Sequence, residues 1–90
     1  MIARSIETKL EEAFNPLELE IINESQKHAG HHGHTGGDET HFHVRAVAAD
    51  FAGLNRMARQ RAVYALLKDE FAAGLHALSL DLKTPEEAGL

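Results

Sequence analysis

The chain has 90 residues, 43% of them hydrophobic and 26% charged, and it contains no cysteine. This size and composition indicate one globular domain, residues 1–90, with a thin core. Without cysteine the chain alone builds no disulfide framework and no cysteine-ligated zinc or iron–sulfur site. The formal charge of −5 with neutral histidines argues against tight, sequence-independent nucleic-acid binding.

The sequence also predicts where the protein resides. No apolar stretch reaches the ~18 residues that a membrane span needs. The N-terminus lacks the apolar core of a signal peptide. We therefore expect a cytoplasmic protein that does not enter membranes, or an organelle-matrix protein if a transit peptide was removed.

The first half of the chain predicts a helix and two strands. Residues 1–14 repeat apolar side chains every four positions, as one side of a helix does, and Asn15-Pro16 ends that helix. Residues 17–23 and 42–48 alternate apolar and polar side chains, which is typical of half-buried strands. We expect these strands to pair antiparallel across a long, flexible loop of about residues 26–38, rich in glycine and histidine.

The second half predicts a helical segment and a third strand. Residues 50–55 read as a turn or short helical piece, and residues 56–73 as a single, largely covered helix closed by Gly74. Residues 75–82 alternate again and predict a strand. Thr84-Pro85-Glu86-Glu87 is typical of a helix start, with about one helical turn to follow. The fold class expected from this order is α+β, a sheet layer packed on a helix layer.

Histidine is the unusual residue of this sequence, since six of the seven histidines lie between residues 28 and 43. Imidazole is the commonest metal ligand. The predicted loop holds four of them: His28, His31, His32 and His34. The histidine content of this loop predicts zinc or nickel binding. The alternative is a solvated tract that binds metal only incidentally.

The remaining histidines fall on predicted strands. His41 and His43 lie on a polar face and are expected to make cross-strand hydrogen bonds. His76 shares a face with Leu78, because side chains alternate along a strand, and so lies at the edge of the apolar face. From the residues alone it is a core-edge histidine that hydrogen-bonds to the backbone.

Several short runs, taken in order, resemble the BolA family over nearly the whole chain. The runs are Asn23-Glu24-Ser25, Glu39-Thr40-His41-Phe42, Phe51-Ala52-Gly53, Arg59-Gln60-Arg61, Leu75-His76-Ala77-Leu78 and Thr84-Pro85-Glu86-Glu87. The chain departs from the family pattern at Gln60, where the family usually has histidine, and at Ala88, where tryptophan is common. The resemblance implies an αββααβ fold similar to the class II KH domain.

The resemblance also implies a partner and a cofactor: a monothiol glutaredoxin with a shared [2Fe–2S] cluster, in iron–sulfur trafficking or iron regulation. A [2Fe–2S] centre can take histidine on one iron and cysteine on the other. A chain without cysteine would supply the histidine half, and the glutaredoxin and glutathione would supply the thiolates. The resemblance makes His76 one ligand and a loop histidine the other. His28 is our first choice, then His31, with His32 and His34 behind them.

The residues support other classes of function less well. Arg59 and Arg61 lie about 200° apart around a helix, so they point to different sides. One is predicted to be solvated and the other to meet an acidic partner, glutathione or nucleic acid. A KH-like DNA-binding transcriptional regulator ranks lowest, because the Gly-x-x-Gly pattern at residues 30–33 lies between strands rather than helices. No serine has a general base placed near it by the sequence spacing, so we expect no enzymatic activity. The sequence leaves open whether the protein forms a homodimer.

Overall fold

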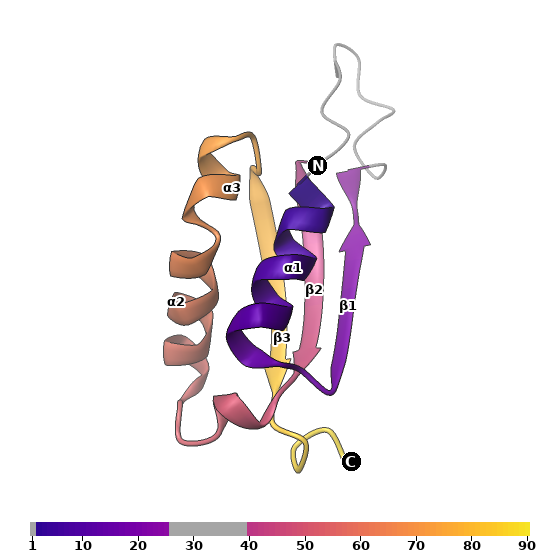
Figure 1. Cartoon of the computed structure of the whole chain (residues 1–90), viewed down its shortest axis with the longest axis vertical. Coiled ribbons are helices and arrows are strands. Elements are labelled where there is room, and N and C mark those ends of the chain that lie inside the picture. Colours follow the sequence, from indigo (N-terminus) through magenta and orange to yellow (C-terminus); the bar gives the residue numbers. More distant parts are fainter. Residues whose placement is uncertain (1, 26–39) are drawn as a thin grey trace.

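The computed structural model describes residues 2–25 and 40–90. Its elements are α1 (Ile2–Phe14), β1 (Glu18–Asn23), β2 (His41–Val47), the short 3-10 helix η2 (Ala49–Phe51), α2 (Arg56–Leu66), α3 (Lys68–Ala72) and β3 (Ala77–Lys83). The strands form one sheet in the order β1-β2-β3, with β1 antiparallel and β3 parallel to β2. Figure 1 shows α1 and α2 side by side over this sheet. The predicted α+β class and the αββααβ order are confirmed.

The core lies between the helices and one face of the sheet. Ile6 and Leu10 of α1 are fully buried, as their four-residue spacing predicts. Phe42 and Val44 of β2 pack against them, together with Val63 of α2. The alternation in β2 therefore sends its apolar side chains to the helices and leaves its polar side chains on the opposite face.

The predicted single helix over residues 56–73 is wrong, because it divides at Leu67. The backbone of Leu67 (φ −97°, ψ 20°) departs from helical geometry. Its N–H still donates to the Val63 carbonyl at 3.0 Å, and its own carbonyl accepts from Phe71 N–H at 3.1 Å. The chain therefore keeps both backbone hydrogen bonds of Leu67 where α2 ends and α3 begins. Leu67 itself is fully buried in the core.

The outer side of α2 is more exposed than the sequence predicts. Met57 is 60% exposed and Tyr64 is 39% exposed. The described helices pack on the sheet as a single layer, so part of the surface of α2 stays open to solvent, although the Tyr64 hydroxyl reaches the Leu78 carbonyl of β3 at 2.8 Å. The prediction that the helix is largely covered is therefore wrong for this side.

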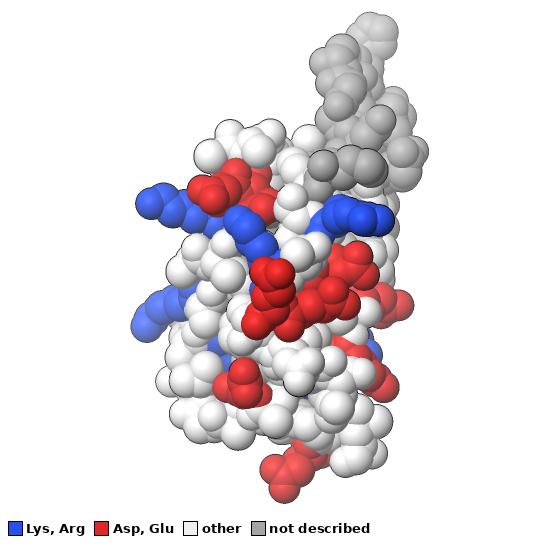
Figure 2. Space-filling view, viewed as in Figure 1, with Lys and Arg blue, Asp and Glu red and all other residues white. Residues whose placement is uncertain are grey.

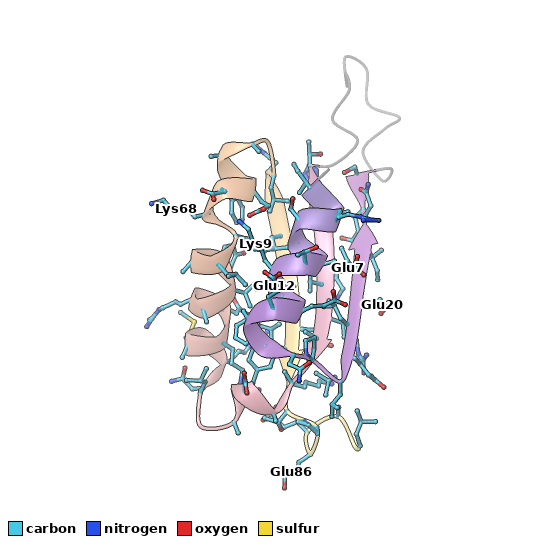
Figure 3. All side chains as sticks on the ribbon, in the orientation of Figure 1. Glu7, Lys9, Glu12, Glu20, Lys68 and Glu86 are labelled. Atoms are coloured by element: carbon cyan, nitrogen blue, oxygen red, sulfur yellow. The ribbon has the colours of Figure 1, made fainter. Side chains whose placement is uncertain are left out.

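An ion pair ties α1 to α3. The Lys9 ammonium donates to the Glu70 carboxylate at 2.9 Å, and Glu70 is buried while Lys9 is only partly covered. Figure 3 shows Lys9 pointing from α1 toward the neighbouring helices. The hydrogen bond to Glu70, assisted by the charges of Glu70 and Asp69, raises the pKa of Lys9 above its ordinary value. A buried carboxylate needs such a partner, so this pair helps to fix the direction of α3.

The surface seen in Figure 2 is acidic over α1 and β1. Glu7 and Glu12 of α1 and Glu20 of β1 belong to this region (Figure 3). Among the described helices, none is long and apolar enough to cross a membrane.

Candidate functional site

His76 lies in the connection between α3 and β3, at the end of the sheet where β1 finishes and β2 and β3 begin (Figure 1). Gly74, at φ +130°, turns the chain out of α3 in a conformation that favours glycine. Leu75 is then buried, and its N–H donates to the Glu70 carbonyl at 2.9 Å. His76 itself is exposed. The site therefore presents an accessible imidazole immediately after a buried anchor.

The carbonyl of Thr40 fixes the backbone at this histidine. It accepts from His76 N–H at 2.8 Å and from Ala77 N–H at 2.9 Å. Because two successive amides converge on one acceptor, the regular alternation of β3 does not extend back to residue 76. The strand begins at Ala77, and His76 is exposed while Leu78 is buried. The prediction that His76 lies at the edge of the apolar face with Leu78 is therefore wrong.

A buried serine joins the two chain segments that flank residues 26–39. Ser25 is 1% exposed, and its hydroxyl oxygen accepts from Thr40 N–H at 3.0 Å and from His41 N–H at 3.1 Å. Asn23 Oδ1 accepts from Ser25 N–H at 2.9 Å and sets the serine in place. Sequence reasoning missed this arrangement. Its only local signal is the Asn-x-Ser spacing, which is typical of a side-chain-capped turn.

His41 lies against His76, with ring centroids 5.5 Å apart. One ring nitrogen of His41, Nδ1, is 2.8 Å from the hydroxyl oxygen of Thr40. The predicted cross-strand hydrogen bond is confirmed for His43, whose Nδ1 is 2.7 Å from Ser79 Oγ. The contact between His41 and His76 was not predicted, since it depends on the parallel register that sets His41 opposite Ala77.

The loop histidines lie outside the described residues. His28, His31, His32 and His34 belong to this segment, as do the Gly-x-x-Gly pattern at 30–33 and the flexible loop predicted at 26–38. Their roles as ligands stay predictions. Within residues 2–25 and 40–90, no three histidine, aspartate or glutamate side chains are grouped so that they could hold a metal ion.

The two arginines differ in their surroundings. Arg59 donates to both carboxylate oxygens of Glu87, at 2.6 and 3.2 Å, and to the carbonyls of Leu54 and Leu82. Arg61 is exposed. Arg59 therefore joins α2 to the end of β3 and the C-terminal turn, and Arg61 points elsewhere, as their helical spacing predicts.

We expect the contribution of Glu87 to stability to depend on pH. The hydrogen bond from Arg59, followed by one from Thr84 N–H, lowers the pKa of Glu87 from 4.5 to about 2. A lowered carboxyl pKa stabilises the fold above the unfolded-state pKa, and this stabilisation is lost as pH falls through the folded-state pKa. Urea unfolding of the natural chain and Glu87→Gln should therefore differ at pH 7, and the difference should shrink between pH 4.5 and about 2. A difference independent of pH would contradict this assignment.

We also expect Gly74→Ala to destabilise the domain by about 1–3 kcal/mol. A Cβ here would meet only Ile2 Cδ1, at an ordinary 3.9 Å, so the cost comes from the backbone at φ +130° rather than from crowding. Urea unfolding measures it. A loss below about 0.5 kcal/mol, the size expected of an ordinary surface substitution, would mean that the turn before His76 tolerates other residues.

The fold and this site define a small α+β domain with a fixed, exposed histidine beside one end of its sheet. A family model described as BolA-like protein matches residues 10–87. The chain belongs to the BolA-like protein family.

Individual relatives agree with this assignment. The chain is 51% identical over 87 residues to an uncharacterized protein in the cobS 5′ region of Sinorhizobium sp., covering 96% of this chain and 94% of that protein. It is 47% identical over 88 residues to the chloroplastic protein BOLA1 of Arabidopsis thaliana, covering 96% of this chain but only 55% of the relative. The solved structure of Arabidopsis BolA1 superposes with a TM-score of 0.85 at 47% identity, over 94% of this chain and 93% of that one.

Proposed function

We propose that this protein is a non-enzymatic adaptor that binds a monothiol glutaredoxin through a shared [2Fe–2S] cluster and serves iron–sulfur trafficking or iron regulation. The observation that carries the proposal is His76. Its imidazole is exposed, and its backbone is fixed by the Thr40 carbonyl. A ligand held in this way loses little conformational freedom when it coordinates.

The donor atoms of the chain fit half of such a cluster. Imidazole can replace thiolate on one iron of a [2Fe–2S] centre. The 90 residues include no cysteine, so the thiolates would come from the glutaredoxin and from glutathione. We propose His28 as the second imidazole, with His31, His32 and His34 as further candidates.

Exposed residues of α2 are candidates for contact with the partner. Met57, Arg61 and Tyr64 are exposed and spaced three or four residues apart, which places them on one side of the helix. The Tyr64 hydroxyl donates to the Leu78 carbonyl at 2.8 Å, so this side of α2 borders β3 just after His76. Arg61 is the better candidate for an acidic partner, because Arg59 already pairs with Glu87.

The experiment is reconstitution of the mixed complex. The protein is mixed with a monothiol glutaredoxin, iron, sulfide and glutathione, and visible absorption and circular dichroism are recorded after gel filtration. We expect both chains to elute together with a spectrum that differs from that of the glutaredoxin alone. Separate elution, with the glutaredoxin spectrum unchanged, would refute the proposal.

A further inference from the structure

We propose that His41 and His76 form a two-imidazole chelate for a single divalent transition-metal ion in the protein alone. The inference shares His76 with the proposed function but needs neither a glutaredoxin nor a cluster. It also needs no histidine of the loop, because both imidazoles lie within the described part of the chain.

The spacing of the two rings fits one metal ion. A Zn–N bond to imidazole is about 2.0–2.1 Å long, and the ring centroid lies roughly 1.1 Å beyond the nitrogen, so two imidazoles on a tetrahedral ion have centroids about 5 Å apart. The centroids of His41 and His76 are 5.5 Å apart, with their planes inclined at 54°. The two rings are therefore close enough for one ion to bind a nitrogen of each, with the exposed His76 ring rotating about its side-chain bonds to meet it.

Thr40 organises both ligands. Its hydroxyl oxygen is 2.8 Å from His41 Nδ1, and its carbonyl accepts from His76 N–H at 2.8 Å. Metal-binding histidines usually hold their second ring nitrogen in a hydrogen bond, which fixes the ring and its tautomer. With His41 Nδ1 as the donor to the Thr40 hydroxyl oxygen, His41 has this arrangement and would coordinate through Nε2. The buried Ser25 hydroxyl in turn accepts from Thr40 N–H, so the whole arrangement is anchored in the fold.

The chemistry of the pair selects the class of ion. Imidazole suits zinc, nickel and copper better than magnesium or calcium. Among residues 2–25 and 40–90 no third protein ligand joins the pair, so water or a partner's side chain would complete the coordination. Because His76 belongs to both sites, a bound ion and the shared cluster would exclude each other.

The test is nickel binding, measured by calorimetry, on the full chain with the four loop histidines replaced by glutamine. This background removes the competing imidazoles. We expect one Ni²⁺ per chain. His41→Asn and His76→Asn should each weaken the affinity for Ni²⁺ by at least about tenfold, because removing a residue that only supports a metal ligand already costs about this much. His43→Asn is the matched control, because His43 lies on the same face of β2 but bonds Ser79. It should leave the affinity unchanged.

A zinc titration followed by NMR provides the second readout and checks that each variant is folded. The ring signals of His41 and His76 should shift together and saturate at one equivalent. The inference is overturned if the loop-substituted chain binds no Ni²⁺ below about millimolar, or if His41→Asn binds as tightly as its parent. If the loop-substituted chain binds no nickel while the natural chain forms the mixed cluster, this inference is overturned and the proposed function stands. If the loop-substituted chain binds nickel while the natural chain forms no mixed cluster, the proposed function fails and this inference stands.

Discussion

Replacing His76 with asparagine is expected to abolish the mixed [2Fe–2S] complex with a monothiol glutaredoxin. The substitution removes the imidazole but keeps a polar side chain on the backbone that Thr40 fixes. Because His76 is exposed, we expect the free energy of unfolding to change by no more than about 0.5 kcal/mol. Visible circular dichroism of the reconstituted mixture measures the complex, and urea unfolding measures the stability.

The matched control is His43→Asn. His43 lies in β2, and its ring pairs with Ser79 on the exposed face of the sheet. It should form the mixed complex as the natural chain does. If both variants retained the mixed spectrum, His76 would not be the ligand. If both lost it together with several kcal/mol of stability, the loss would reflect unfolding instead.

Replacing Ser25 with alanine is expected to cost about 2–4 kcal/mol of unfolding free energy, because two backbone N–H groups lose their acceptor. These groups belong to Thr40 and His41, and the serine is 1% exposed, so water cannot readily take its place. Urea unfolding with linear extrapolation measures the change. The same variant should weaken the mixed complex. Thr40 N–H then loses its hydrogen bond to the Ser25 hydroxyl, and the Thr40 carbonyl holds the backbone of His76.

Ser79→Ala is the matched control for this loss. Ser79 is exposed, and its hydroxyl oxygen lies 2.7 Å from His43 Nδ1 on the surface of the sheet. We expect Ser79→Ala to change the free energy of unfolding by no more than about 0.5 kcal/mol. Equal losses at both serines would show that the buried hydroxyl does not hold the two segments together. Ser25→Thr retains the hydroxyl and should recover part of the stability.

Features determined by neighbouring residues were predictable from the sequence. The four-residue spacing of Ile6 and Leu10 placed both on the buried side of α1, and the alternation around Phe42 placed it in the core. The reciprocal hydrogen bonds between Thr84 and Glu87 also follow from a short motif. Each depends on residues within a few positions of one another.

Features that depend on tertiary packing were not predictable. The break between α2 and α3 falls at Leu67, which is buried in the core, and nothing in the local sequence marks it. The contact between His41 and His76 follows from the register of two parallel strands joined by a long crossover. The resemblance to the BolA family singled out His76 as a candidate ligand, but the local sequence could not identify its neighbour.

The most direct test of the central claim is to detect the bond between this protein's imidazole and the cluster. The chain is prepared with ¹⁵N-labelled histidine, reconstituted with unlabelled glutaredoxin, iron, sulfide and glutathione, reduced, and studied by electron–nuclear double resonance. We expect a ¹⁵N coupling from coordinated imidazole that weakens or disappears in His76→Asn and persists in His43→Asn. A reduced cluster in the isolated mixed complex without any ¹⁵N coupling would contradict it.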